Sequence, residues 1–284
     1  MADVIRCIES KAKQLDEKLE NTRYSRIALL DSNILVSGQG YFDFKNDMEL
    51  ERHFYRRLEN KIDGFRFTVK GNQLYDIDRQ RCVGYLDEII KSNIKGYKKQ
   101  IKKGKISSCR KITDSIPDWR CKKTETIIGI PDFIFAETES TIINSFLDIE
   151  KYEKWHSALI ENENSEFIKF KTKFIKYGEN KNGFRHKTFN GKLTNHEREK
   201  EILFSTDIKY QDICDQMLFF SALEILYKTD LEGVYIVTND RAFHGRTKEV
   251  LKQKHNRRED GKYVKIYSSD DFCSKLQRKG TKLS

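Results

Sequence analysis

The chain has 284 residues, a formal net charge of +10 and a sequence pI of about 9.1. This length accommodates one large domain or two small ones, and no apolar run approaches the roughly 20 residues of a membrane-spanning helix. The positive charge indicates an anionic partner, with nucleic acid as the first expectation and the anionic face of a membrane as the second.

The first part of the chain alternates helical and extended patterns. Residues 3–20 combine apolar positions at helical spacing with both charge signs, so they predict an amphipathic helix rather than a signal peptide. The short apolar run 27–30 is typical of a strand buried on both faces. We expect a charged helix at 46–61, followed by a β-hairpin that turns at Gly71-Asn72.

Positive charge concentrates between residues 91 and 111, where nine Lys or Arg residues occur without an Asp or Glu. A helix is predicted at 83–95, at the start of this run. Such a segment is usually a solvated loop, but it is also the pattern expected of a surface that contacts RNA. The lysines that we expect to bind phosphates are Lys98, Lys99, Lys102, Lys103 and Lys105.

The second half of the chain repeats a strand-then-helix pattern. A short strand at 126–129 is followed by Pro131, which suits the first turn of a helix over 132–149. Residues 151–205 are polar and resist assignment. Four aromatic residues there have a helical spacing that favours core packing over base stacking, namely Phe167, Phe170, Phe174 and Tyr177.

The remaining elements predict the fold class. Strands are expected at 234–237 and 263–267, and helices at 212–227, after residue 240 and from residue 269. Strands that alternate with helices predict an α/β fold, in which a parallel sheet carries helices on both faces.

Acidic residues lie at the ends of several apolar elements. Asp31 follows the strand at 27–30, Asp240 follows the strand at 234–237, and Asp215 opens an apolar helix. Open α/β sheets place their chemistry at the carboxyl edge of the strands. Carboxylates gathered there repel one another unless a cation joins them, and oxygen ligands suit Mg²⁺ or Mn²⁺. The pattern therefore indicates metal-assisted chemistry on a phosphate.

Four stretches in order, ALLDSNIL, IPDFIFAETES, DICDQMLFFSAL and YIVTNDRAF, resemble the PIN domain, and VKIYSSDDF resembles that family's last strand and helix. The resemblance covers about residues 22–38, 126–150 and 207–284. It implies a PIN-like parallel β-sheet flanked by helices over 1–40 and 122–284. The intervening residues 41–121 would then be a large basic α+β insertion after the first strand.

The PIN family comprises metal-dependent nucleases that mostly cut single-stranded RNA, and the resemblance implies roles for matching residues here. The catalytic, metal-binding acids match Asp31, Glu137, Asp215 and Asp240. Asp212 lies on the same helical face as Asp215 and is expected to supplement or replace it. The supporting polar residues match Ser32, Asn33 and Thr238.

The implied reaction is hydrolysis of a phosphodiester bond. One or two Mg²⁺ or Mn²⁺ ions would lower the pKa of the attacking water, neutralise charge at the phosphate and, for the second ion, hold the leaving oxygen. The implied function is thus a divalent-metal-dependent endoribonuclease with RNA as its partner.

Other interpretations stay open at this point. The same acids would serve a structure-specific DNA nuclease of the same superfamily. An inactive scaffold that binds RNA or protein is a third hypothesis, against which the presence of all four acids argues. Taken singly, Asp31 and Asp240 are also plausible turn or helix N-cap residues, and Glu137 and Asp215 plausible solvated helix residues.

The six cysteines are spread along the chain without a CxxC pair, which is typical of reduced thiols in a cytoplasmic protein. A zinc site built from Cys109, Cys121 and a histidine is a minor alternative. The six histidines are otherwise expected to be surface or structural residues. The sequence leaves the oligomeric state open, a homodimer included.

Overall fold

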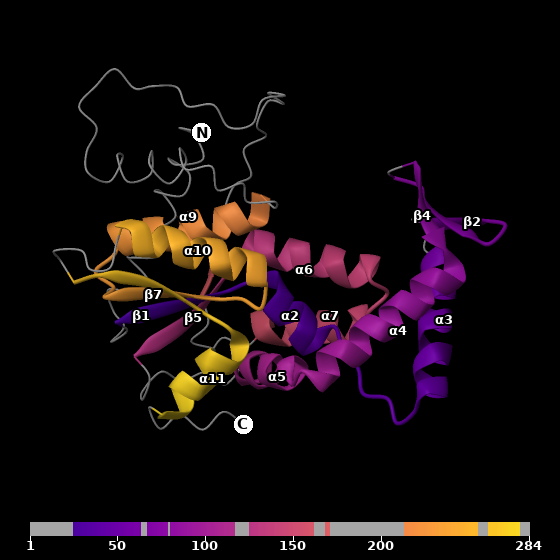
Figure 1. Ribbon diagram of the computed structural model, residues 1–284, viewed down its shortest axis with the longest axis horizontal. Coiled ribbons are helices and arrows are strands. Elements are labelled where there is room, and N and C mark those ends of the chain that lie inside the picture. Colours follow the sequence, from indigo (N-terminus) through magenta and orange to yellow (C-terminus); the bar gives the residue numbers. More distant parts are fainter. Residues whose placement is uncertain are drawn as a thin grey trace, which may run out of the picture.

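The main body is an α/β layer structure in which a parallel sheet lies between helices (Figure 1). The computed structural model describes residues 25–63, 67–78, 80–116, 125–161, 168–170, 213–254 and 261–278. The sheet has five strands in the order β6-β5-β1-β7-β8, and every neighbouring pair is parallel. These strands are β1 (Arg26–Leu30), β5 (Thr126–Pro131), β6 (Ile168–Phe170), β7 (Gly233–Val237) and β8 (Tyr263–Tyr267).

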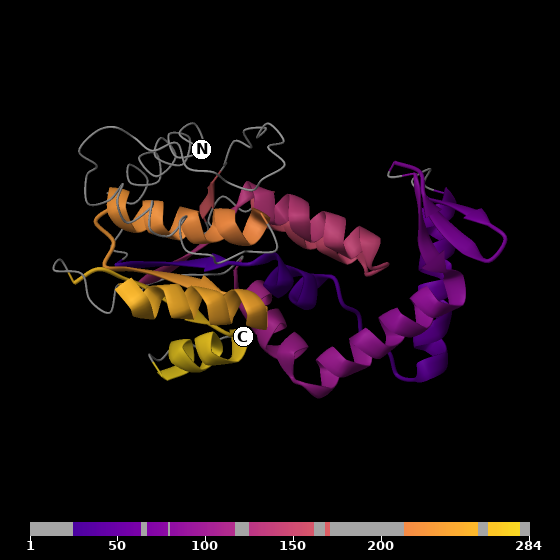
Figure 2. The same ribbon diagram turned by 45° about the horizontal axis from the view of Figure 1, so that its top comes forward.

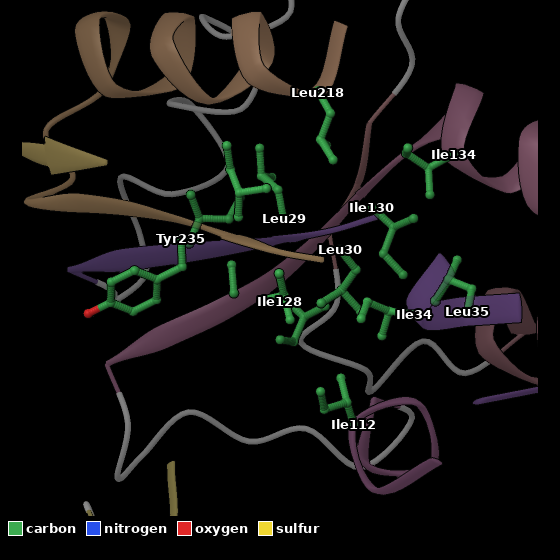
Figure 3. Packing of buried hydrophobic residues seen from close by; sticks show 14 of the residues in the cluster. Leu29, Leu30, Ile34, Leu35, Ile112, Ile128, Ile130, Ile134, Leu218 and Tyr235 are labelled. Atoms are coloured by element: carbon green, nitrogen blue, oxygen red, sulfur yellow. The ribbon is translucent and has the colours of Figure 1, made fainter. Parts of the chain in front are cut away.

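The helices of the main body pack on both faces of this sheet. They are α2 (Ser32–Gln39), α5 (Lys105–Ser115), α6 (Asp132–Asn144), α7 (Ile149–Glu161), α9 (Ile213–Lys228), α10 (Arg241–Lys254) and α11 (Ser269–Arg278). Strands β5 and β7 are buried along their whole length, as a doubly covered parallel sheet requires. Figure 3 shows the result, with Leu218 of α9 approaching one face of the sheet and Ile112 of α5 the other.

Helix α5 lies unusually close to α2, and Gly38 explains the approach. A Cβ atom at Gly38 would lie 2.5 Å from Thr113 Oγ1 of α5, so a side chain there would force the helices apart. The neighbouring Gln39 is buried and donates a hydrogen bond to Thr113 Oγ1 at 2.8 Å. This contact fixes α5, and with it the end of α4, against the helix that follows Asp31.

Residues 41–102 form a second unit, which we call the lobe. It contains α3 (Asp47–Asp63), an antiparallel sheet of β2 (Phe67–Lys70), β3 (Gln73–Asp76) and β4 (Arg81–Tyr85), and helix α4 (Leu86–Lys102). Figure 1 shows the lobe projecting from the main body, and Figure 2 shows α4, in magenta, running from it back to the body. A hydrophobic cluster separate from that of the main body holds the lobe together.

Contacts with the connection between α6 and α7 anchor the lobe to the main body. Phe146, from the connection between α6 and α7, is buried within the hydrophobic cluster of the lobe. Arg57 of α3 forms an ion pair with Asp148, which lies just before α7. The lobe is therefore attached at its base as well as through the chain connections.

The structure agrees with most predicted elements and differs in five places. The predicted helix at 83–95 is wrong at its start, because Arg81–Tyr85 is an edge strand and the helix begins at Leu86. Pro131 ends β5 and takes the N-cap position of α6 instead of entering the helix. The basic segment is helical, in α4 and α5, rather than a loop.

The helix predicted over 132–149 ends at Asn144, and α7 begins at Ile149. Phe146 in the turn has a positive φ of 54°, which breaks the helix and directs its ring into the lobe. Phe170 lies in strand β6, so its helical spacing was misleading. Residues 3–20, Asp212 and Cys121 lie outside the described ranges. Every described helix is too short or too polar to cross a bilayer.

Candidate active site

The candidate site lies where the strand order of the sheet reverses. The chain passes from central strand β1 to β5 and β6 on one side, and then to β7 and β8 on the other. Open α/β sheets bind ligands outside the carboxyl ends of the strands at such a switch point. Asp31 directly follows β1, and Asp240 follows β7 by three residues. Because β1 and β7 are paired in register, these two acids emerge at neighbouring strand ends.

All four predicted acids line one pocket of about 400 Å³. Asp31 comes from the turn between β1 and α2, Glu137 from α6, Asp215 from the first turn of α9, and Asp240 from the turn before α10. More than 200 residues of sequence separate the first acid from the last. The fold therefore brings four distant carboxylates to one concave surface.

Asp31 is held in place by polar neighbours rather than by a helix cap. It takes the N-cap position of α2, yet its side chain makes no capping hydrogen bond. Its Oδ2 accepts hydrogen bonds from the Thr238 hydroxyl and from Asn33 Nδ2, the latter at 2.5 Å. Its Oδ1 accepts one from the Ser32 hydroxyl at 3.3 Å. The three residues expected to support the site thus all contact Asp31.

The surroundings of Asp31 disfavour its charge. The residue is only 4% exposed, and burial raises the pKa of its carboxyl from 3.8 to about 6. Hydrogen bonds from Thr238 and Ser32 lower this pKa, while the nearby negative charge of Asp240 raises it. No positive charge is among the main causes that set this pKa. The negative charge of Asp31 is therefore not compensated by a neighbouring cation.

Thr238 joins the two aspartates. Its hydroxyl donates to Asp31 and accepts a hydrogen bond from the Asp240 backbone amide at 3.0 Å and from Asn33 Nδ2 at 2.9 Å. Asn33 Oδ1 in turn accepts a hydrogen bond from the Asn239 backbone amide at 2.9 Å. The loops after β1 and β7 are therefore fastened to each other through side chains.

Asn239 is a structural residue of the site that the sequence analysis missed. Its Oδ1 accepts hydrogen bonds from the backbone amide and hydroxyl of Ser269, both at 3.1 Å, and its Nδ2 lies 3.1 Å from Cys109 Sγ. Its carbonyl oxygen accepts a hydrogen bond from Lys105 Nζ at 3.3 Å. Asn239 thus connects the loop after β7 with α5 and α11. The only signal in the sequence was its place between Thr238 and Asp240.

Asp240 caps a helix and also lines the pocket. Its Oδ1 accepts hydrogen bonds from the backbone amides of Ala242 at 2.7 Å and Phe243 at 3.0 Å, so the residue caps α10. The N-cap interpretation is therefore correct for this oxygen. Both capping bonds use Oδ1, and the side chain also lines the pocket.

Glu137 and Asp215 are half-buried residues of the pocket wall. The Oε2 atom of Glu137 is fully buried. Glu139, two residues further along α6, is exposed and does not line the pocket. This contrast distinguishes the two glutamates that the sequence offered.

The donor set suits a hard divalent cation, because it consists of carboxylate oxygens. No three Asp, Glu, His or Cys side chains in the described ranges are already grouped closely enough to hold one ion. The negative charge of Asp240 raises the pKa of Asp31, so the two carboxylates repel each other. A bound cation would remove that repulsion and allow the carboxylates to approach one another.

Basic residues lie beside this pocket, and the structure divides the five predicted lysines. Lys98 forms an ion pair with Asp47 of α3. The positive charge of Lys99 is the main cause of a lowered pKa at Lys103, to which Arg241 and Lys105 also contribute. Lys99, Lys103, Lys105 and Arg241 therefore form one group, which we call the basic cluster. Arg241 directly follows Asp240, so the cluster adjoins the acidic pocket.

Helix α4 provides a wall of the pocket that the sequence did not indicate. Uncharged residues of this helix, among them Asn93 and Gln100, line the same pocket as the four acids. Their distance in sequence from every acid left no local signal.

The chain matches no protein-family model, no curated protein and no solved structure, so its function is inferred from this geometry.

Proposed function

We propose that this protein is a divalent-metal-dependent, PIN-like endoribonuclease that hydrolyses phosphodiester bonds of single-stranded RNA. The observation that carries the proposal is the meeting of Asp31, Glu137, Asp215 and Asp240 in one pocket. These acids come from four elements, and each belongs to one of the four stretches that resemble the PIN domain. Unrelated surface acids would have no reason to converge in this way.

The position of the pocket supports the same proposal. It lies at the carboxyl edge of a parallel sheet, at the switch point beside the central strand. Asp31 is buried, raised in pKa and hydrogen-bonded by neighbouring side chains. A perturbed carboxyl in a concave site is a functional candidate with a physical cause.

The residues have separable tasks in this proposal. A divalent cation bound by the acids would lower the pKa of a water molecule and offset the negative charge that develops at the phosphate. Thr238, Asn33 and Ser32 fix the direction of the Asp31 oxygens. Asp240 offers its second carboxylate oxygen while the first caps α10. Glu137 and Asp215 complete the oxygen donors and can orient the attacking water.

The basic cluster supports a polyanionic substrate. Lys99, Lys103, Lys105 and Arg241 lie near one another beside Asp240. Phosphates on either side of a scissile bond would pass over these cations, and neutralising the phosphates would release the counterions condensed on the nucleic acid. An isolated acidic pocket would repel such a substrate.

A cleavage panel tests the proposal. The purified protein is incubated with end-labelled single-stranded RNA, duplex RNA, single-stranded DNA and duplex DNA, each with Mg²⁺, Mn²⁺ or EDTA. We expect internal cuts in single-stranded RNA with either metal and none with EDTA. Cleavage of DNA alone would favour the structure-specific DNA nuclease, and binding without any cleavage would favour the inactive scaffold.

Two variants of α6 provide the matched control. Glu137→Gln removes a carboxylate from the pocket, whereas Glu139→Gln makes the same change at an exposed position two residues away. We expect the first to lose cleavage and the second to retain it. Equal activity in both variants would show that the cuts come from another site or from a contaminating nuclease.

A further inference from the structure

Helix α4 of the lobe presents an uncharged stripe to the acidic pocket. The residues of α4 that line the pocket are Ser92, Asn93, Gly96, Tyr97 and Gln100, which share one face at helical spacing. The same helix carries five lysines, and none of them lines the pocket. The wall that α4 provides is therefore uncharged, although the helix carries five lysines.

Gly96 leaves open space in this wall. It lies inside α4, and no atom of the described chain is within 4 Å of a Cβ built at this position. Glycine is a poor helix former, and close packing of a neighbour does not account for it here. Its missing side chain instead enlarges the pocket at the middle of the stripe.

An aromatic surface adjoins this space. Tyr41 and Tyr97 both line the pocket, and their rings stack with centroids 5.4 Å apart and planes inclined by 16°. The Tyr97 hydroxyl donates a hydrogen bond to the Phe42 carbonyl, and Tyr97 is buried in the hydrophobic cluster of the lobe. The aromatic pair is therefore fixed before any ligand arrives.

These groups match the chemistry of a nucleobase. Aromatic rings stack on the faces of bases with little regard to sequence. The side-chain amides of Asn93 and Gln100 each offer two donor hydrogens and an acceptor oxygen, which is the kind of group that pairs with a base edge. Base edges are free for such contacts only where the nucleotide is unpaired.

We propose that the pocket binds one unpaired nucleotide with its base against α4. Gly96 leaves room for the base, Tyr41 provides a stacking face, and Asn93 and Gln100 contact its edge. The sugar and phosphate then face the acids. This inference rests on the proposed function, because it identifies single-stranded nucleic acid as the substrate form and assigns its recognition to the lobe.

Binding to a variant that does not cleave tests the inference separately from the reaction. All proteins carry Asp31→Asn, and fluorescein-labelled homopolymeric RNAs and a duplex RNA are titrated by anisotropy in Mg²⁺. Gly96→Leu fills the open space, and Gly245→Leu is the matched control. Gly245 is a helical glycine of α10 that also has open space around it but does not line the pocket.

We expect single-stranded RNA to bind more tightly than the duplex. Gly96→Leu should weaken binding of single strands about 10-fold or more, the size of a lost base-stacking interaction, and Gly245→Leu should leave it unchanged. Asn93→Ala with Gln100→Ala should reduce the differences among homopolymers. Circular dichroism confirms that each variant retains its helices.

The inference is overturned if Gly96→Leu binds single strands as the parent does, or if the duplex binds as tightly as the single strand. Neither result depends on cleavage. If the wild-type protein cleaves nothing while Gly96→Leu still impairs binding, the nuclease proposal fails and the base-binding wall stands. If the wild type cleaves RNA and Gly96→Leu has no effect on binding, the nuclease proposal stands and the base-binding wall fails.

Discussion

The carboxylate of Asp31 is placed where a charge is unfavourable. It is buried, its pKa is raised to about 6, and the neighbouring charge of Asp240 adds to the effect. Three side chains nevertheless hold its oxygens in fixed positions. A residue that lowers the stability of the metal-free fold and is still elaborately positioned is a candidate for function rather than for structure.

Replacing this carboxylate should stabilise the metal-free protein. The folded pKa of Asp31 exceeds its ordinary value of 3.8, so the folded state binds more protons between pH 4 and 6 and loses stability as the pH rises through this range. Asp31→Asn should therefore gain up to about 3 kcal/mol at pH 7, and much less at pH 4. Urea unfolding in EDTA at both pH values measures the difference. An equal loss of stability at both would contradict the raised pKa.

Thr238 should matter for activity more than for stability. Thr238→Val keeps the shape of the side chain but removes the hydroxyl that joins Asp31 to the Asp240 amide. Loss of a group that orients a metal ligand commonly costs about 10–100-fold in activity. Thr247→Val is the control, because Thr247 is equally buried and its hydroxyl has no hydrogen-bond partner among the described residues. Similar cleavage rates in both variants would show that Thr238 has no special role.

Two substitutions separate the cap from the charge at Asp240. Asp240→Asn can still accept the amide hydrogen bonds of Ala242 and Phe243, whereas Asp240→Ala cannot. We expect both variants to lose cleavage, and only Asp240→Ala to lose about 1 kcal/mol of unfolding free energy. Cleavage by Asp240→Asn at the wild-type rate would show that this residue serves only as a helix cap.

At the scale of elements, four of the five strands of the main sheet were predictable, whereas the short strand β6 and the edges of the lobe were not. Strand β1 and strand β7 are short apolar runs that only a doubly covered sheet accommodates. Strand β4 is exposed on almost every residue, so its sequence carries no burial pattern. The end of α6 depends on Phe146, whose ring enters the cluster of another unit. Such tertiary contacts leave no periodic signal in the local sequence.

The two sides of the basic segment should differ in their contact with nucleic acid. Lys99 and Lys103 belong to the basic cluster, whereas Lys98 is paired with Asp47 and Lys102 is not among the charges that lower the pKa of Lys103. Changing Lys99 and Lys103 to Ala should reduce the log–log salt slope of binding by about 1.4, at roughly 0.7 per phosphate contact of a single strand. Changing Lys98 and Lys102 to Ala should alter it little. Equal slopes in the two double variants would mean that binding depends on the number of positive charges and not on their positions.

At the scale of the whole molecule, the pocket is shared by two units. The acids come from the main body, and α4 of the lobe supplies another part of the pocket wall. The sequence supported Asp31, Asp215 and Asp240 because each lies at the end of an apolar element, and it supported Glu137 through the resemblance of IPDFIFAETES to the PIN domain. It could not indicate α4 as a wall, because that depends on how α5 packs on α2 and on how Phe146 and Arg57 anchor the lobe.

Manganese binding tests the central claim, that the acidic pocket is a divalent-metal site, most directly. Titration at neutral pH, followed by the electron paramagnetic resonance signal of free Mn²⁺, gives affinity and stoichiometry without a substrate. We expect one or two ions per chain, bound at least about 10-fold more weakly by Asp31→Asn and with wild-type affinity by Glu139→Gln. Affinity should also fall below about pH 6, where Asp31 takes up a proton. No bound Mn²⁺, or equal binding by the wild type and Asp31→Asn, would show that the acidic pocket is not a divalent-metal site.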